Sequence, residues 1–245
     1  MNDQYVVIMG ANSAIASAFA RFQVASDKHF ILVGRDQKRL EELAQELVDL
    51  GAENVEVIDY DFSNIENHAS LTASVFSYHI KTLLIAYGTL PNQQKCLLDP
   101  VYGLKHYHLN ATSTISLLCH VFDPLKKQRS GKVAVITSVA GDRGKKSNYL
   151  YGSAKGSVSI FLQGYRVDLA VEGVHVMDIK PGFVDTPMTK DMKKGLLWAQ
   201  PDHIARSISR GLKKNKNVVY APLFWKYIMC LFRMIPEELY KKLKL

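Results

Sequence analysis

Cysteine is scarce in this chain of 245 residues, so a disulfide-stabilised fold is excluded. The three cysteines, Cys96, Cys119 and Cys230, are odd in number and form no CxxC pair. We therefore expect reduced thiols in a cytoplasmic protein. The eight histidines offer no ligand spacing, since His106 and His108 are two positions apart and point to different faces of a helix. No metal site is expected.

Long hydrophobic runs are also missing. The most apolar stretch, residues 218–232, is interrupted by Lys226 and is shorter than the ~20 residues that a membrane-spanning helix needs. Asn2 and Asp3 provide no basic region of a signal peptide. We expect a protein that does not cross a membrane, while peripheral contact with the cytoplasmic membrane face stays open.

Acidic residues are fewer than basic ones, 23 against 31, so the formal net charge is +8 and anionic partners are favoured. The imbalance is concentrated in residues 211–245, which hold eight lysines and arginines and two glutamates. The nearly neutral remainder argues against a nucleic-acid-binding protein. Hydrophobic residues make up 47% of the chain, enough to exclude disorder and to build one compact domain.

Short apolar runs alternate with longer segments of helical period. The expected strands are 5–9, 30–33, 55–60, 82–86, 133–137, 174–179 and 218–220, and the expected helices are 15–25, 36–50, 65–78, 104–122 and 149–171. This alternation predicts an α/β fold, a single-domain, Rossmann-like doubly wound parallel sheet of about seven strands with helices on both faces. Its ligands should bind outside the carboxyl ends of the strands. We assign residues 1–221 to the domain with the active site and 222–245 to a basic, aromatic-rich extension of it.

The first strand ends in a tight turn, Gly10-Ala11-Asn12-Ser13-Ala14-Ile15-Ala16, that opens a helix. Such a turn lets backbone N–H groups and the helix dipole hold the pyrophosphate of a dinucleotide. Because Ala14 and Ala16 stand where glycines are usual, an ordinary strand-to-helix turn is the alternative. The expected contacts are Gly10, Asn12, Ser13, Ala14 and Ile15.

The second strand ends Val33-Gly34-Arg35-Asp36. An acid at this strand end would bind a ribose 2′-OH, whereas an arginine accommodates a 2′-phosphate. Gly34 stands where the acid would be and Arg35 follows, so NADP(H) is preferred and NAD(H) is the alternative cofactor. An arginine on a solvated helix face is the other explanation, and Asp36 weakens the inference.

The next two strand ends supply further candidates. Asp61, followed by Phe62, is placed to accept from an adenine amine. Gly88, after Ala86 and Tyr87, allows the backbone close to a cofactor. Ordinary turn chemistry is the alternative for both ends.

A serine, a tyrosine and a lysine follow in an informative order. Ser138 closes the fifth expected strand, and Tyr151-Gly152-Ser153-Ala154-Lys155 begins the next helix. Residues four apart share a helix face, so Lys155 is expected beside Tyr151, where it would lower the tyrosine pKa for acid-base work near neutral pH. Ser138 is expected to hydrogen-bond a substrate oxygen and Asn110 to hold a water. A surface helix is the alternative for the bare YxxxK spacing.

With these motifs in order from Tyr5 to Thr186, the chain resembles the short-chain dehydrogenase/reductase family. The resemblance implies that Tyr151 is the general acid-base and that Lys155 lowers its pKa and binds the nicotinamide ribose. It implies that Ser138 orients the carbonyl and that Asn110 sustains a proton relay. It also implies nicotinamide contacts and a homodimer or homotetramer packed through the helices of Leu104 and Tyr151. The implied nicotinamide segment consists of Pro181, Gly182, Val184 and Thr186.

A narrower resemblance lies in Ser138–Arg143, Tyr149–Ser153 and the segment from Val219 to Pro236. These are similar to the reductases of decaprenylphosphoryl-ribose 2′-epimerases, which reduce a lipid-linked 2-keto-pentose after a flavoprotein partner has oxidised the ribose. This resemblance implies a keto-sugar substrate on a polyprenyl phosphate and a flavoprotein oxidase as partner.

The carboxyl-terminal extension has two explanations. Large apolar residues from Phe224 to Ile235 are mixed with Lys226 and Arg233, which favours an interfacial helix on anionic lipid. A cover over the substrate pocket or an oligomer interface is the alternative. Residues 185–200 are expected to form a substrate lid. Its lysines, Lys190, Lys193 and Lys194, are candidates to contact a phosphate, and a solvated face is the alternative.

Together these features predict a carbonyl reductase (an alcohol dehydrogenase in reverse) in which Tyr151 donates the proton, acting on a small-molecule or lipid-linked keto-sugar. A short-chain oxidoreductase of a soluble ketone or an acyl-carrier substrate is the first alternative. A cofactor-binding regulator without catalysis is the second, although the Ser138, Tyr151 and Lys155 set argues against it.

Overall fold

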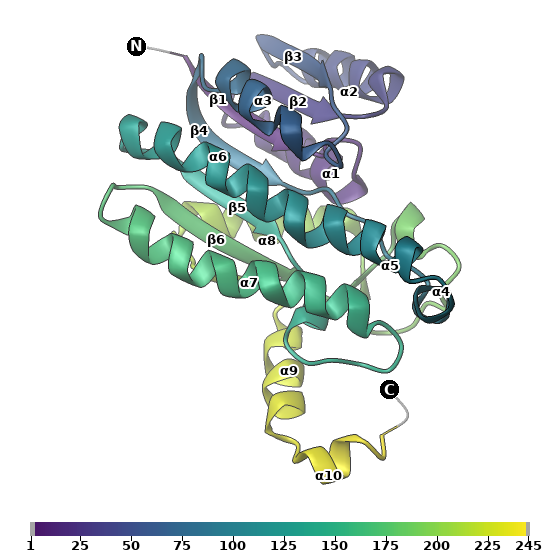
Figure 1. Ribbon diagram of the computed structural model, residues 1–245. Coiled ribbons are helices and arrows are strands. Elements are labelled where there is room, and N and C mark those ends of the chain that lie inside the picture. Colours follow the sequence, from purple (N-terminus) through teal and green to yellow (C-terminus); the bar gives the residue numbers. More distant parts are fainter. Residues whose placement is uncertain (1–2, 244–245) are drawn as a thin grey trace.

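The computed structural model describes residues 3–243. Two residues used in the sequence predictions lie outside this range: Asn2, where the basic region of a signal peptide would begin, and Lys244 of the basic tail. A parallel sheet of seven strands crosses the molecule in the order β3-β2-β1-β4-β5-β6-β9 (Figure 1). This order confirms the doubly wound fold, with the reversal between β1 and β4. The strands are β1 Gln4–Met9, β2 His29–Gly34, β3 Asn54–Asp59, β4 His79–Ile85, β5 Lys132–Ile136, β6 His175–Pro181 and β9 Val218–Ala221.

Helices cover both faces of this sheet. One face carries α1 (Ala14–Gln23), α2 (Gln37–Asp49) and α8 (Pro201–Lys213), and the other carries α3 (His68–Val75), α6 (Ser113–Gln128) and α7 (Tyr149–Ala170). The remaining helices are α4 Gln93–Leu98, α5 Pro100–Tyr107, α9 Phe224–Met234 and α10 Glu237–Tyr240, with short turns η1 Ile65–Asn67, η2 His108–Thr112, η3 Val139–Gly141 and η4 Pro187–Thr189.

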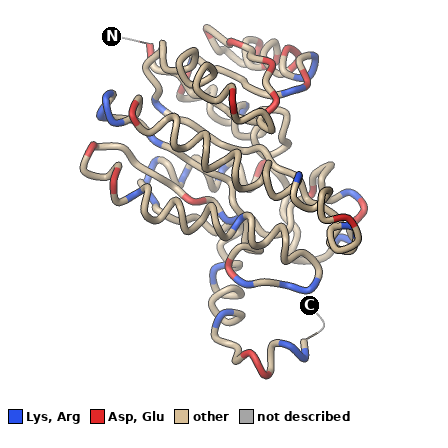
Figure 2. Tube along the Cα trace, viewed as in Figure 1, with Lys and Arg blue, Asp and Glu red and all other residues tan. Residues whose placement is uncertain are grey.

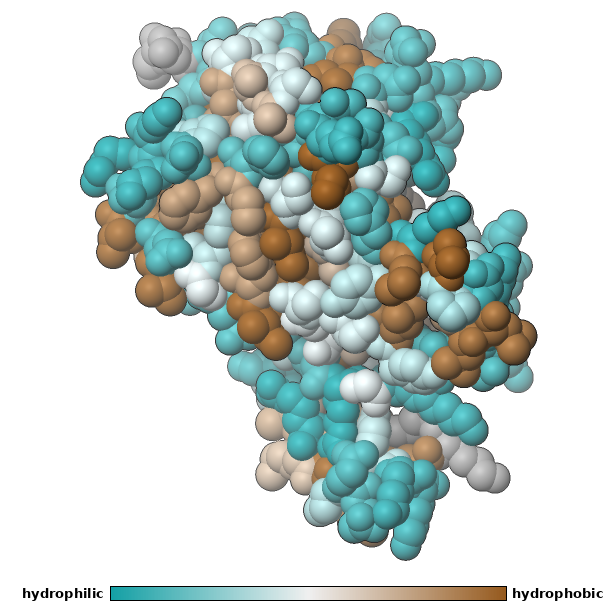
Figure 3. Space-filling view, viewed as in Figure 1, coloured by the Kyte–Doolittle hydropathy of each residue, from teal (hydrophilic) through white to brown (hydrophobic). Residues whose placement is uncertain are grey.

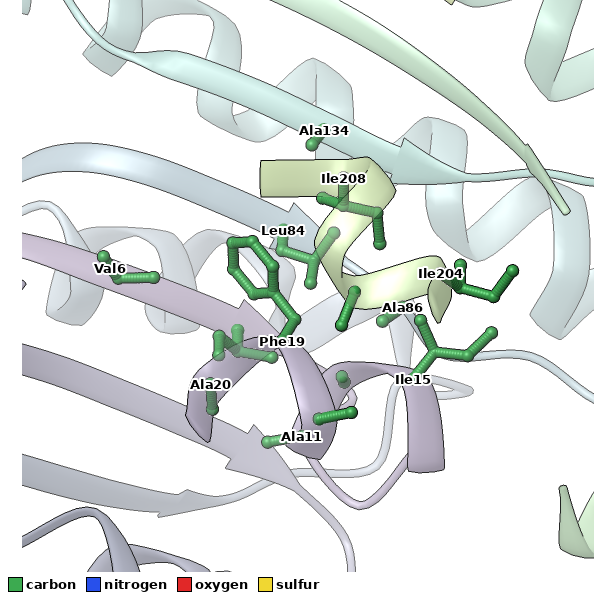
Figure 4. Close-up of a cluster of buried hydrophobic side chains, with 14 of the residues drawn as sticks. Val6, Ala11, Ile15, Phe19, Ala20, Leu84, Ala86, Ala134, Ile204 and Ile208 are labelled. Carbon is green, nitrogen blue, oxygen red and sulfur yellow. The ribbon is translucent and has the colours of Figure 1, made fainter. Parts of the chain in front are cut away.

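The two-residue period of the strands explains the two layers of core. In β1, Val6 and Ile8 face one layer while Val7 and Met9 face the other, and all four are fully buried. On the first face, Phe19 of α1 meets Leu84 of β4 and Ile208 of α8 (Figure 4). A sheet buried on both sides is what continuous apolar strands predict.

Local sequence signals set several element boundaries. Asp36 caps α2 by accepting from the backbone N–H of Arg39, and Asp99 caps α5 just before Pro100. The expected helix 104–122 is wrong in its bounds, because α5, the π-helical turn η2 and α6 replace it. A π-turn inserts an extra residue into the helix, and the hydrophobic period does not reveal it.

Helix α8 and a small second sheet are among the parts of the fold that the sequence prediction lacks. Helix α8 buries Ile204, Ile208 and Leu212, whose helical spacing was a usable signal. The small sheet of β7 (Phe183–Val184) and β8 (Trp198–Ala199) has strands of two residues each, which are too short to carry a period. Among residues 3–243, the structure shows no helix that is long and apolar enough to cross a membrane.

Candidate active site

A cleft of about 740 Å³ opens at the carboxyl ends of the strands. Every residue that the sequence predicts for catalysis or cofactor binding lines it, including the four catalytic candidates Asn110, Ser138, Tyr151 and Lys155. The other predicted residues in its wall are Gly10, Asn12, Ser13, Ala14, Ile15, Arg35, Asp61, Phe62, Ala86, Tyr87, Gly88, Pro181, Gly182, Val184 and Thr186. The fold therefore brings together residues from six strand ends.

The turn between β1 and α1 requires a glycine at its first position. Gly10 has φ +89°, and a Cβ there would lie 2.6 Å from the backbone nitrogen of Tyr87. The Gly10 N–H donates to the Val33 carbonyl at 2.8 Å, so the turn is fixed to β2. The amino terminus of α1, which follows at Ala14, lines the cleft without a side-chain cap and is suited to hold an anionic group.

The end of β2 presents basic side chains to the cleft. Arg35 is exposed there, and Asp36 is used in capping α2. Arg39, which the sequence analysis missed, also lines the cleft and donates to the Asn12 carbonyl at 3.2 Å. Its position one turn into the helix after the strand was the signal that could have identified it. Two arginines therefore flank this end of the cleft.

The residues that follow β3 and β4 line the cleft, and Asp61 stabilises the turn after β3. Asp61 accepts from the backbone N–H of Ser63 at 2.9 Å, which is the main cause of its lowered pKa, while the charge of Arg35 contributes less. The ring of Phe62 stacks on Tyr87 with centroids 4.0 Å apart. A Cβ at Gly88 would lie 2.6 Å from the Asn110 Oδ1 atom and 3.3 Å from the Lys155 Nζ atom. Gly88 therefore keeps open the space beside these two polar groups.

Ser138 and Tyr151 are brought together by close backbone packing. Ser138 follows β5, and its Oγ accepts from the Ala140 N–H at 3.1 Å. A Cβ on Gly152 would lie 2.6 Å from the Ala140 carbonyl oxygen, so only glycine lets α7 approach the η3 turn this closely. The serine hydroxyl consequently lies within hydrogen-bonding reach of the tyrosine.

The expected effect of Lys155 on Tyr151 is not what the structure shows. Burial raises the pKa of Tyr151 to about 12, opposed by the hydrogen bond with Ser138. Burial also lowers the pKa of Lys155 to about 8, opposed by the charge of Asp178. Lys155 is 5% exposed and donates from Nζ to the Ile136 carbonyl at 3.0 Å. Both groups lie in a poorly solvated wall, where loss of water disfavours each charged form.

Asn110 lies in the π-helical turn η2 between α5 and α6. Its Oδ1 accepts from the Thr89 N–H at 3.0 Å, and its Nδ2 donates to the carbonyls of Thr89 and His106 at 2.8 and 2.9 Å. Both amide protons are therefore used, and one lone pair of Oδ1 remains. The side chain joins the segment after β4 to the helix that carries it.

A buried polar network lies behind the catalytic wall. Asp178 of β6, 2% exposed, accepts from the hydroxyls of Thr137 and Ser159, the latter at 2.7 Å. Lys180 lies 3.7 Å from this carboxylate and pairs with Asp142 at 2.5 Å. The network joins β6 to α7 and to the segment after β5, and the charge of Asp178 favours the charged form of Lys155.

The segment after β6 agrees in part with the predicted lid. Thr186, Met188 and Met192 line the cleft. The predicted phosphate-binding role of its lysines is not supported, because Lys194 pairs with Asp185 at 2.6 Å and none of the three lysines lines the cleft. Residues 196–198 also lie outside the cleft wall.

The carboxyl-terminal extension contributes to the site through α9. Trp225 is 2% exposed, lines the cleft and packs so closely on Gly182 that a Cβ there would lie 1.8 Å from the indole nitrogen. Pocket covering, one of the two predicted roles, is therefore confirmed for Trp225. The opposite face of α9 is exposed at Tyr227 and Leu231.

A Rossmann-type sheet with Ser138, Tyr151 and Lys155 in one cleft defines the class of dinucleotide-dependent oxidoreductases. The model of the short chain dehydrogenases matches residues 4–196. An uncharacterized oxidoreductase of Mycobacterium tuberculosis is 30% identical over 97% of this chain and 96% of its own length. This chain belongs to the short-chain dehydrogenase/reductase family of oxidoreductases.

Other relatives agree with this assignment. An uncharacterized oxidoreductase of Streptomyces coelicolor is 30% identical over 97% of this chain and 95% of its own length. A Burkholderia cenocepacia short chain dehydrogenase, solved in complex with NADP, has a TM-score of 0.83 and 17% identity, covering 100% of this chain and 98% of its own. A Sphingobium yanoikuyae short-chain dehydrogenase in complex with NADPH also has a TM-score of 0.83, with 22% identity, covering 96% and 97%. The structural likeness establishes the fold.

Proposed function

We propose that this protein is an NADP(H)-dependent carbonyl reductase. The observation that carries the proposal is the placement of Ser138, Tyr151 and Lys155 in one wall of a cleft that also contains the Gly10 turn. The unobstructed amino terminus of α1 and the space beside Gly88 fit a dinucleotide, and Arg35 and Arg39 fit its 2′-phosphate. The solved NADP and NADPH complexes of similar fold support the same cofactor.

The catalytic roles follow from the chemistry of each side chain. When bound, the reduced nicotinamide supplies the hydride that adds to the carbonyl carbon. Ser138 Oγ hydrogen-bonds the carbonyl oxygen, and Tyr151 Oη donates the proton, so the products are an alcohol and a tyrosinate. Its raised pKa keeps Tyr151 protonated at neutral pH, which suits reduction. Lys155 then stabilises the tyrosinate, and a proton from solvent reaches Tyr151 Oη past Asn110 to restore the hydroxyl.

The cofactor preference is tested by titration followed through nicotinamide fluorescence. We expect NADPH to bind at least about tenfold more tightly than NADH, and Arg35→Asp to reverse this order, because a 2′-phosphate loses a charge-assisted partner and meets a carboxylate. Arg206→Asp, an exposed change on α8, is the matched control and should leave the preference unchanged. Equal affinities in the wild type would refute the NADP(H) preference. If neither nucleotide bound, both the reductase and the cofactor-binding regulator would be refuted.

A narrower candidate for the substrate is a keto-sugar on a polyprenyl phosphate, with a flavoprotein oxidase supplying the ketone. It is supported by α9, which reaches the cleft through Trp225 and has several exposed apolar residues. Figure 2 shows basic positions along the same helix. A helix that exposes apolar residues next to basic ones can bind an anionic lipid surface. The exposed apolar residues are Leu223, Phe224, Tyr227, Leu231 and Met234.

Vesicle sedimentation tests this candidate. We expect the protein to sediment with phosphatidylglycerol vesicles and the double substitution Tyr227→Glu and Leu231→Glu to abolish binding, because charge on the apolar face opposes insertion. Val48→Glu, on an exposed position of α2, is the control and should bind normally. No sedimentation of the wild type, combined with turnover of small ketones, would favour the soluble-ketone or acyl-carrier alternative.

We also propose that the chain self-associates. Exposed apolar side chains gather over α4 and α5 (Figure 3), including Leu97, Leu98, Val101 and Leu104, and α7 exposes Ile160 and Val167. Contiguous apolar surface of this kind marks interaction sites. A homodimer or homotetramer through these helices would bury it.

A further inference from the structure

Lys145 lies in the segment between η3 and α7 and lines the cleft. Its Nζ atom lies 5.8 Å from the ring centroid of Trp225 and 5.3 Å from that of Phe232, both on α9. Figure 1 shows α9 at the end of the molecule remote from α2, where Arg35 and Arg39 lie. The cleft therefore has a second cationic region, away from the proposed nucleotide phosphates.

The charge of Lys145 is not compensated by the described part of the chain. The acids in the cleft wall, Asp36 and Asp61, follow β2 and β3 at the arginine end. On the elements that adjoin the lysine, Asp142 pairs with Lys180 and Glu237 pairs with Arg143. Among residues 3–243, no carboxylate oxygen lies within 4.0 Å of the Lys145 Nζ atom.

Two further polar atoms, on residues of the same cleft wall, lack partners. The Oδ1 atom of Asn148 and the Nε1 atom of Trp225 are both buried without a hydrogen bond in the described structure, and both residues line the cleft. Lys145 is half-buried, and this burial lowers its pKa. Unpaired buried polar groups are rare in folded proteins, and a bound ligand is one reason for them.

We propose that Lys145, together with Asn148 and Trp225 in the same cleft wall, forms a subsite for a phosphate group of the substrate. The subsite rests on the proposed reductase function, because it places this group at one side of the carbonyl held by Ser138 and Tyr151. Asn148 Oδ1 accepts from a hydroxyl of the same substrate, and the aromatic ring of Trp225 orients the ammonium group. The substrate class is therefore a hydroxylated ketone that carries a phosphate.

Titration of the NADP⁺-saturated protein with inorganic phosphate tests the subsite without turnover. The chain has two tryptophans, so ¹⁵N-indole labelling gives two Nε1 resonances that Trp198→Phe assigns. We expect the Trp225 resonance to shift saturably and Lys145→Gln to weaken the apparent Kd by at least about tenfold, because a charge-assisted contact is lost. Lys146→Gln, at the exposed neighbouring lysine outside the cleft wall, is the matched control and should titrate like the wild type.

Farnesyl phosphate is titrated beside inorganic phosphate to identify the source of the group. Tighter Lys145-dependent binding of farnesyl phosphate supports the subsite and assigns it to a lipid-borne phosphate, whereas equal Lys145-dependent binding supports it for a small phosphate ester. The same Kd in wild type and Lys145→Gln, or no shift of the Trp225 resonance, overturns the proposal. Phosphate binding could depend on Lys145 while the protein oxidises no NADPH with ketone substrates. That result would refute the reductase function and leave the phosphate subsite standing.

Discussion

Tyr151→Phe is expected to lower kcat for carbonyl reduction by about a thousandfold while leaving NADPH affinity unchanged, since positioned acid-base catalysis contributes about 10²–10⁴-fold. The substitution removes only the Oη atom, which carries the transferred proton. Ser138 and Lys155 keep their contacts with the Ala140 N–H and the Ile136 carbonyl, so the cleft is preserved. Without the proton donor, the developing alkoxide has only the serine hydroxyl to stabilise it.

The measurement is NADPH oxidation with a small ketone, together with a fluorescence titration of NADPH. Tyr149→Phe is the matched control, because Tyr149 lies two residues earlier on α7, is 42% exposed and does not line the cleft. It should retain full activity. A Tyr151→Phe enzyme with more than a tenth of the wild-type kcat would refute the assigned role of the tyrosine.

Asp178→Ala is expected to lower the free energy of unfolding by about 3 kcal/mol. This loss is a large fraction of the total stability of a typical domain. The change leaves the buried hydroxyls of Thr137 and Ser159 without their acceptor and removes one of two carboxylates near Lys180. It also removes the negative charge that raises the pKa of Lys155. The stability loss and a lower Lys155 pKa should therefore appear together.

Urea unfolding followed by circular dichroism measures the first effect. Asp168→Ala, an exposed acid on α7, is the control and should change stability by less than about 0.5 kcal/mol. Asp178→Asn keeps an acceptor for one hydroxyl. Its loss of unfolding free energy is therefore expected to lie between the losses for Asp178→Ala and Asp168→Ala. A loss below about 1 kcal/mol for Asp178→Ala would show that the network around Lys180 does not depend on this carboxylate.

The long, strongly periodic parts of the fold were predictable because their signals are local. Apolar strands such as β1, a glycine at the turn that follows and the four-residue spacing of Tyr151 and Lys155 are all visible along a short stretch of chain. The rule that parallel strands place their ligands at their carboxyl ends then brings distant residues into one cleft. This explains why every predicted catalytic and cofactor-binding residue lines the observed cleft.

The missed features depend on contacts between segments that are distant in sequence. Trp225 enters the cleft because α9 returns onto Gly182, some forty positions earlier, and no local pattern contains that contact. The same return gives Lys145 its aromatic neighbours. Two-residue strands and a π-turn carry too few residues to show a period.

The doubly wound fold, the family and most residues of the candidate site follow from the chain alone, because hydrophobic period and motif order are properties of the amino-acid sequence. Only the tertiary structure decided the electrostatic state of those residues. The spacing of Tyr151 and Lys155 predicted a lowered tyrosine pKa, whereas their common burial raises it to about 12. Spacing specifies which groups share a helix face, but their pKa depends on the water and charges that the whole fold leaves around them.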